Sequence, residues 1–259
     1  MLSGPSSASH LLVRVPVRGV HPMRLLIVAD LHYSLPQFDW LVEHAADYDA
    51  VIIAGDLLDI ASVVDPGTQI IVVLKYLAKL RMKTRILVCS GNHDLDGTGP
   101  GGEKQALWMS SVKRLIIPAD GDTLMLDDMM VTICAWWDGP ATQKAIAADL
   151  EAAAVDRRGP WIWIYHAPPE GASTCWDGHR FIGDEFLRKW IERFQPDMVL
   201  SGHIHKSVTA NYRNTTLICG SCWQGKTIFQ EKVGHNPGPS RVPIVNLQTR
   251  DVKILKFGQ

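Results

Sequence analysis

Three short apolar segments separated by helical patterns constrain the fold of this chain most strongly. The segments cover 25–29, 50–54 and 85–89, and their almost continuous apolar character is typical of strands buried on both faces. Between them, residues 38–46 and 68–82 carry apolar side chains at helical spacing. This β-α-β-α-β order predicts parallel strands joined by right-handed crossovers.

The rest of the chain predicts a second sheet. Strands at 123–126 and 130–135 are joined by a hairpin-like Asp127-Asp128 pair. The remaining expected elements are helices at 141–154 and 186–194, and strands at 161–165, 197–200, 206–211, 214–219, 226–231, 241–247 and 251–257. We therefore expect an α/β fold in which two mixed sheets pack together with helices outside them.

The first 22 residues differ from the rest of the chain, being rich in Ser and irregular in pattern. They lack the apolar stretch of about 7–15 residues that a secretory signal needs, so we expect a loose tail or an added edge strand. Residues 23–259 are expected to form a single domain, and Met23 is a candidate alternative start. We expect residues 96–102, with the sequence DGTGPGG, to form a slack surface loop.

Composition excludes several classes of protein. The formal net charge of -1 disfavours a dedicated nucleic-acid binder, although a local basic patch remains compatible with it. No apolar segment is long enough to cross a membrane, so no membrane partner is expected. Five cysteines, an odd number in a chain of 259 residues, predict reduced thiols and a cytoplasmic location. Oligomeric state is left open.

Polar clusters follow five of the predicted strands. In chain order they are Asp30-x-His32, Gly55-Asp56-x-x-Asp59, Gly91-Asn92-His93-Asp94, His166, and Gly202-His203-x-His205. Each cluster alone is a weak signal, but in open α/β sheets the carboxyl ends of the strands form the ligand-binding edge. Carboxylate, imidazole and amide oxygen donors suit Mn, Fe, Zn, Co or Ni. Asp56, on the middle strand of the first three, is the natural residue to bridge two cations, and two cations about 3.5–4 Å apart can activate water for attack at phosphorus.

These five motifs together resemble the calcineurin-like metallophosphoesterase superfamily. The resemblance implies a four-layer α/β/β/α sandwich with a dinuclear metal site between the sheet edges. The short prokaryote-type phosphodiesterases and phosphatases are the most similar members. Ile60-Ala61 after Asp59 departs from the Arg that protein Ser/Thr phosphatases carry there, and Asp59 itself replaces the metal-binding Tyr of purple acid phosphatases.

The resemblance also implies a role for each site residue. It assigns the first metal to Asp30, His32 and His205, the second to Asn92, His166 and His203, and the bridge between them to Asp56. A bridging water or hydroxide would attack phosphorus, His93 would act at the leaving group, and Asp94 would orient His93. For Asp59 two roles stay open, a partner of the site or a residue at a helix start.

The expected function is hydrolysis of a small-molecule phosphodiester or phosphomonoester, dependent on two divalent transition-metal ions, Mn, Fe or Zn. The alternatives are a nuclease of the same superfamily, which needs nucleic acid as a partner, and a non-catalytic scaffold with the same fold.

Several further residues have two interpretations. We expect Trp136-Trp137 to pack under a loop, the alternative being that they line the substrate pocket and stack on a base or aromatic group. We expect residues 175–180 to form a solvated loop, the alternative being that His179 or Arg180 meets a phosphate oxygen. Trp161 and Trp163 are expected in the core. The Cys219-x-x-Cys222 pair has no second pair to form a metal site with, and we assign it no role.

Overall fold

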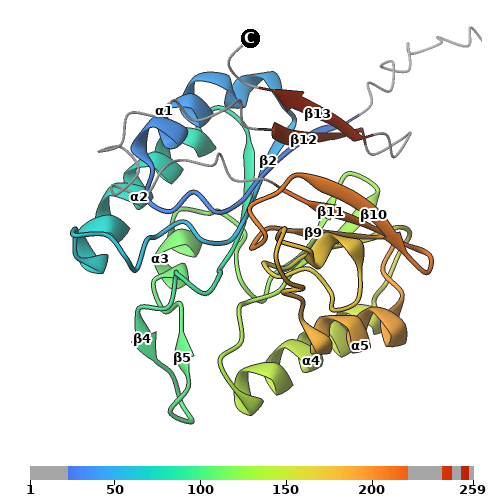
Figure 1. Cartoon of the computed structure of the whole chain (residues 1–259). Helices are drawn as coiled ribbons and strands as arrows, with labels where there is room; N and C mark the ends of the chain where they lie inside the picture. The colour runs from blue at the N-terminus through green and yellow to red at the C-terminus, as the bar shows by residue number, and fades with distance from the viewer. Residues whose placement is uncertain (1–22, 221–240, 247–251, 257–259) are drawn as a thin grey trace, which may run out of the picture.

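The computed structural model describes residues 23–220, 241–246 and 252–256, and two β-sheets form its centre (Figure 1). The first sheet has the strand order β13-β12-β1-β2-β3. Its strands are β1 (Arg24–Val28), β2 (Ala50–Ala54), β3 (Arg85–Cys89), β12 (Arg241–Asn246) and β13 (Val252–Lys256). Strands β1, β2 and β3 are parallel, whereas β12 and β13 pair antiparallel. The predicted parallel opening is therefore present, and the carboxyl ends of three strands share one edge.

The second sheet has the order β10-β11-β9-β8-β7-β6. Its strands are β6 (Thr123–Leu126), β7 (Met129–Ile133), β8 (Trp161–Ile164), β9 (Met198–Ser201), β10 (Val208–Tyr212) and β11 (Thr215–Cys219). The four inner strands are parallel, and antiparallel strands lie at both edges. Both sheets are thus mixed, as expected.

Helices cover the outer faces of the two sheets (Figure 1). On the first sheet they are α1 (Leu35–His44), the 3-10 turn η1 (Ala45–Asp47), α2 (Pro66–Arg81) and α3 (Met109–Arg114); on the second they are α4 (Pro140–Val155) and α5 (Glu185–Phe194), with a 3-10 turn η2 (Ser173–Cys175) nearby. Proline near the start of α1, α2 and α4 suits a position whose N–H needs no helical partner. Side-chain caps start two helices, because Asp65 accepts from the Thr68 amide and Asp184 from the Leu187 amide.

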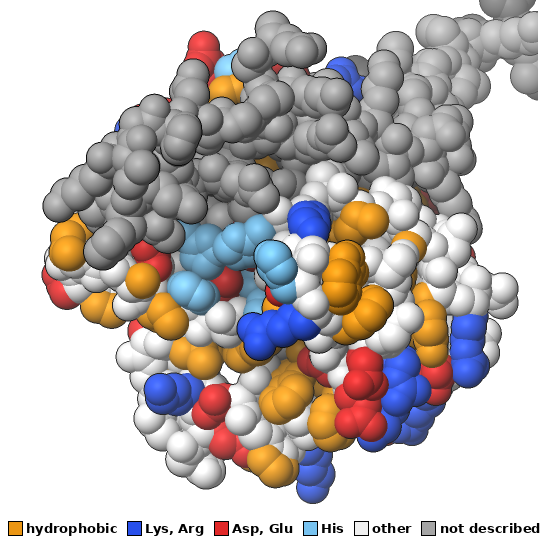
Figure 2. All heavy atoms as spheres, in the orientation of Figure 1, with side chains coloured by type: hydrophobic (Ala, Val, Ile, Leu, Met, Phe, Trp, Pro, Cys, Tyr) orange, Lys and Arg blue, Asp and Glu red, His pale blue; other side chains and the backbone are white. Residues whose placement is uncertain are grey.

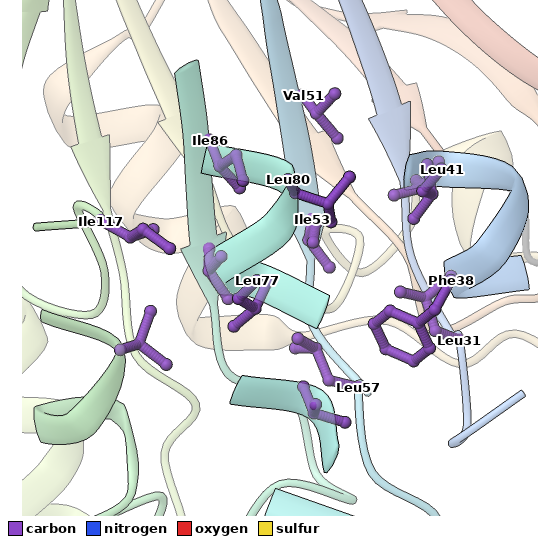
Figure 3. Close-up of a cluster of buried hydrophobic side chains, with 14 of the residues drawn as sticks. Leu31, Phe38, Leu41, Val51, Ile53, Leu57, Leu77, Leu80, Ile86 and Ile117 are labelled. Carbon is purple, nitrogen blue, oxygen red and sulfur yellow. The ribbon is translucent and has the colours of Figure 1, made fainter. Parts of the chain in front are cut away.

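Three buried clusters hold the layers together. The alternation of side chains along each strand turns Leu26 and Val28 towards the helices of the first sheet, and Leu25 and Ile27 towards the second sheet. Figure 3 shows the first of these clusters, where α1 and α2 pack on the strands. The third cluster lies between the second sheet and helices α4 and α5. Trp161 and Trp163 both belong to it and are fully buried, which confirms the prediction that they are core residues.

The segment expected to be a slack loop is instead tied to the rest of the protein. Strands β4 (Gly97–Thr98) and β5 (Lys104–Gln105) pair there as a small hairpin. At its end the Glu103 carboxylate accepts hydrogen bonds from the backbone N–H groups of Ala141 and Thr142, both at 2.7 Å. Glu103 thereby satisfies free amides in the first turn of α4, whose start at Gly139 offers no side-chain cap.

Two expectations lie outside the described residues: the loose tail at 1–22 and the strand at 226–231. In the part of the chain that the structure describes, no helix combines the length and apolarity needed to cross a bilayer.

Candidate metal centre

The loops after β1, β2, β3, β8 and β9 bring the predicted site residues together at the shared edge of the two sheets. Figure 2 shows histidine side chains gathered at one place on the surface, with a carboxylate among them. Among the described residues the candidate ligands form three groups, Asp30 with His32 and His205, Asp56 with His166 and His203, and His32 with Asp59 and His93. In each group one ligand atom per residue lies within 4.8 Å of the others.

The first group is held by residues from opposite ends of the sequence. The Nε2 atoms of His32 and His205 face each other at 3.2 Å. His205 Nε2 also lies 3.7 Å from Asp30 Oδ1. Three donor atoms therefore converge on one point, as a single cation requires.

The second group lies next to the first, with the Asp56 carboxylate between them. Asp56 Oδ2 lies 3.2 Å from His166 Nε2, and the rings of His166 and His203 are 5.1 Å apart at 73°. The same Asp56 oxygen is 3.8 Å from His32 Nε2, which belongs to the first group. The Asp56 carboxylate thus lies between the two groups, the position expected of a bridging ligand.

The backbone at several of these residues adopts an uncommon conformation. The φ angle is positive at Asp30 (56°), His32 (43°), Asp56 (55°), His203 (70°) and His205 (55°). Residues other than glycine rarely adopt this left-handed region, each at a cost of about 1–3 kcal/mol, and such strain concentrates at functional sites. Backbone bonds from Asp30 N to Gly55 O and from His32 N to Asp56 O, both 3.0 Å, hold the first two loops in register.

Burial and neighbouring charges together set the charge state of the site. It raises the pKa of Asp30 to about 7 and lowers the pKa of His32 to about 4 and of His203 to about 3. Burial opposes charge on His166 too, but the carboxylates of Asp56 and Asp30 raise its pKa to about 9. For Asp56, burial favours a higher pKa, yet the adjacent His166 outweighs it and leaves the pKa below its usual range. His32 and His203 are neutral at pH 7, which is the form that binds metals.

The donor set fits metal ions because a buried oxygen in it has no other partner. Asn92 Oδ1 is buried and has no hydrogen-bond partner among the described residues, and the buried His166 Nε2 faces the Asp56 carboxylate at 3.2 Å. Buried polar atoms are normally satisfied, so an unpaired amide oxygen beside an imidazole and a carboxylate matches the need of a cation. His166 is oriented for this role, since its other nitrogen, Nδ1, bonds to the Ala54 carbonyl at 2.7 Å.

The carboxylate next to His93 is Asp59, which differs from the expected pairing of His93 with Asp94. The buried Asp94 carboxylate accepts hydrogen bonds from three backbone amides, those of Leu57, Leu58 and Gly91, at 2.8–3.0 Å. Asp59 Oδ1 lies 3.8 Å from His93 Nδ1 instead. The role expected of Asp94 is therefore corrected, because its oxygens hold the loops after β2 and β3 together. Of the two roles left open for Asp59, its position beside His93 favours a partner of the site over a residue at a helix start.

Replacing Asp94 with Asn is expected to lower the free energy of unfolding by about 2 kcal/mol, because the amide group faces the Gly91 N–H and one buried hydrogen bond is lost. Urea unfolding followed by circular dichroism measures this loss. Asp39→Asn, at an exposed carboxylate bonded to the Tyr76 hydroxyl, is the matched control. An Asp94 variant as stable as the parent protein would contradict the proposed role of Asp94 in holding the two loops together.

The tryptophan pair lies beside the site rather than simply under a loop. The Trp136 ring is 5.6 Å from the rings of both His166 and His203. Both tryptophans pack against the third buried cluster, as expected, and the position of Trp136 beside the two histidines also supports the alternative interpretation. Asp184 and Phe186, near Trp137, were not selected from the sequence, where they read only as the start of a helix.

The remaining two predictions concern residues 175–180 and the Cys219-x-x-Cys222 pair. Arg180 is exposed and His179 and Arg180 donate their backbone amides to Asp177, as expected of a solvated loop. Cys219 is buried and its thiol bonds to the Gly202 carbonyl, whereas Cys222 lies outside the described residues.

Comparison with known proteins places these features in a family. The sequence model of the calcineurin-like phosphoesterases matches residues 23–207. Among solved structures, TT1561 of Thermus thermophilus superposes with a TM-score of 0.67 at 12% identity, over 91% of this chain and 99% of that one. The phosphopantetheinyl hydrolase PptH from Mycobacterium tuberculosis superposes with a TM-score of 0.55 at 14% identity, over 83% and 94%. At these identities the structural likeness shows the fold alone.

Similar sequences among curated proteins carry a different description. A DNA polymerase II small subunit from Halobacterium salinarum is 25% identical over 273 residues, covering 98% of this chain and 52% of the relative. The protein of that name from Pyrococcus horikoshii is 42% identical over 65 residues, 25% of this chain and 10% of the relative. The chain spans about half the length of the Halobacterium relative it matches.

Proposed function

Because the chain belongs to the calcineurin-like phosphoesterase family, we propose that it hydrolyses a phosphodiester or phosphomonoester at a centre of two divalent metal ions. The observation that carries the proposal is the position of Asp56 Oδ2, 3.2 Å from His166 Nε2 and 3.8 Å from His32 Nε2. One carboxylate oxygen thus reaches two sets of donors, and this arrangement suits a metal pair better than a single ion.

Each ion would have its own ligands in addition to Asp56. Asp30, His32 and His205 would hold the first, and Asn92, His166 and His203 would hold the second. When bound, two divalent ions activate a water molecule for attack at phosphorus and neutralise the charge that develops on the phosphate oxygens. Mixed nitrogen and oxygen ligands favour Mn, Fe or Zn.

We assign His93 the role of general acid at the leaving group. The backbone amide nitrogen of Ile60 lies 3.4 Å from His93 Nδ1, and Asp59 Oδ1 lies 3.8 Å from the same nitrogen. The His93 ring lies 4.4 Å from the His32 ring, and its own amide donates to Asp56 Oδ1 at 2.8 Å. These contacts support a general-acid role in which His93, as the imidazolium, would give its Nε2 proton to the departing oxygen and become a neutral ring whose Nδ1 proton faces Asp59.

His93→Ala is expected to reduce kcat by about 10²–10⁴-fold, the usual contribution of a general acid, without changing the metal content. Steady-state kinetics and elemental analysis of the same preparation measure both quantities. His44→Ala is the matched control, since His44 stacks on Trp40 within α1. If the His93 variant lost its metals, His93 would act as a ligand rather than an acid.

The proposal as a whole is tested by stripping the protein of metal and reloading it with Mn²⁺, Fe²⁺, Zn²⁺, Co²⁺ or Ni²⁺. We expect hydrolysis of bis-p-nitrophenyl phosphate or p-nitrophenyl phosphate only after reloading, with about two ions bound per chain. Two bound ions without turnover of either ester would contradict the phosphoesterase proposal. A chain that binds no metal would favour the scaffold alternative.

The relatives named DNA polymerase II small subunit favour a second candidate, a nuclease that cleaves the phosphodiester bonds of DNA. Fluorescently labelled single-stranded and double-stranded oligonucleotides, incubated with the Mn²⁺-loaded protein, test it directly. Metal-dependent cleavage that Asp56→Asn abolishes would support the nuclease, and intact oligonucleotides beside rapid turnover of small esters would exclude it.

A further inference from the structure

A pocket of about 270 Å³ adjoins the candidate metal centre at His203. Its apolar wall is formed by Trp136, Trp137, Ile182 and Phe186. Hydrophobic side chains also border the histidine cluster on the surface (Figure 2). The pocket and the metal centre share one residue, because His203 lines the pocket and is also a candidate ligand of the second metal.

One buried carboxylate, that of Asp184, orients Trp137 in the aromatic wall. Asp184 accepts hydrogen bonds from Trp137 Nε1 at 2.6 Å, from the Tyr165 hydroxyl, and from the Leu187 amide at 2.9 Å. The Trp137 ring then meets the edge of Phe186 at 5.6 Å and 74°. Because the indole is oriented before any ligand enters, binding costs little side-chain entropy.

Charge restricts what the pocket can accept. The residues that line it in the described part of the chain include the carboxylates Asp184 and Glu185 but no lysine or arginine. Glu185 lies 2.8 Å from Lys189 Nζ, and this neighbour lowers the pKa of its carboxyl, so the group is ionised at neutral pH. A second phosphate group would find no cationic lining residue to pair with here, whereas an uncharged ring needs none.

The volume of the pocket and its closeness to the metal centre further limit which ligand can bind in it. A volume of about 270 Å³ is just below the usual range of about 300–1,000 Å³ for small-molecule sites, which suits one ring system. Trp136 lies 5.6 Å from the rings of His166 and His203, so a group attached to a phosphate at the metal centre reaches the pocket directly.

We propose that the pocket formed by Trp136, Trp137, Ile182 and Phe186 binds a flat, uncharged aromatic ring of the substrate, so that the protein selects phosphate esters bearing a nucleobase or an aryl group. This selectivity rests on the proposed function, since it assigns the organic part of the same ester. Flat rings gain from stacking on indole and phenyl faces, and an aliphatic or sugar group of the same charge does not gain as much.

Equilibrium binding, measured by isothermal titration calorimetry, tests the proposal with two matched pairs of ligands, and it uses the Mn²⁺-loaded His93→Ala variant, which is expected to keep its metals and to hydrolyse the esters slowly. AMP is compared with ribose 5-phosphate, and phenyl phosphate with methyl phosphate. We expect each aromatic ligand to bind roughly tenfold or more tightly than its partner, the gain typical of one stacked ring. Tight binding of AMP alone would assign the pocket to nucleobases, and tight binding of both aromatic ligands would assign it to flat rings in general.

Phe186→Leu keeps an apolar side chain and removes the ring, so it is expected to reduce the preference for the aromatic ligands while leaving ribose 5-phosphate unchanged. Phe181→Ala is the matched control, because the Phe181 ring is exposed, pairs with Trp176 and does not line the pocket. Thermal melting of both variants confirms that they fold.

The two proposals fail in different ways. Equal binding of aromatic and non-aromatic ligands, beside hydrolysis of bis-p-nitrophenyl phosphate by the parent protein, would overturn the pocket proposal and leave the proposed function standing. Preferential binding of the aromatic ligands without any turnover by the parent protein would uphold the pocket and count against the proposed function.

Discussion

Asp56→Asn is expected to abolish most phosphoesterase activity, with kcat/KM falling on the order of 10³-fold or more, because a negative ligand shared by two cations is replaced by a neutral group. The change is nearly isosteric. The amide oxygen of Asn can still accept the hydrogen bond that Asp56 Oδ1 takes from the His93 amide at 2.8 Å, so the fold is expected to persist. What is lost is the charge of Oδ2, the atom that lies between His32 and His166.

Metal content provides the second readout for this variant. Elemental analysis is expected to show fewer than two ions per chain for Asp56→Asn, and two for the control Asp39→Asn, at an exposed carboxylate bonded to Tyr76. An Asp56 variant that keeps both ions and its activity would show that Asp56 does not bridge a metal pair.

Gly91→Ala is expected to have the next largest effect, although it removes no ligand. A Cβ atom at position 91 would lie 2.2 Å from Asp56 Oδ1, 2.7 Å from the Asp56 amide nitrogen and 2.8 Å from His166 Cδ2. Contacts this short do not occur in folded proteins, and Asp56 cannot simply turn away because Oδ1 also binds the His93 amide. The loop after β3 and the Asp56 carboxylate must therefore separate.

We expect this displacement to reduce metal occupancy and to lower kcat/KM by about 10²-fold, as small misplacements in active sites do. Overpacking is also expected to lower the free energy of unfolding by about 1–3 kcal/mol. Gly67→Ala is the matched control, since Gly67 lies in the first turn of α2 and a Cβ there meets only the Asp65 carboxylate, at 3.2 Å. Normal metal content and activity in Gly91→Ala would mean that the loops are less closely packed than the structure indicates.

The amino-acid sequence by itself predicted the elements that position the site. Strands β2 and β3 begin and end where the apolar pattern predicts, because a strand buried on both faces needs an unbroken apolar segment. The gathering of Asp30, Asp56 and His203 followed from their places directly after strands, since the carboxyl ends of parallel strands share one edge.

Tertiary structure alone decided which carboxylate meets which partner. Asp94 is adjacent to His93 in sequence, yet its oxygens bind the amides of Leu57 and Leu58, 37 and 36 residues away, and Asp59 takes the place beside His93. No local sequence pattern encodes such pairings, because they depend on how the loops after β2 and β3 lie against each other in the folded protein.

Tertiary structure also determines how the hairpin of β4 and β5 meets α4 and how the pocket beside Trp136 is shaped. Glu103 caps α4 across 38 residues of chain, and Trp137 is oriented by Asp184 across 47. Periodicity and strand-end position are local properties that a sequence displays directly. The orientation of a single side chain depends on the distant groups that satisfy its polar atoms and fill the space around it, and only the folded chain brings those groups together.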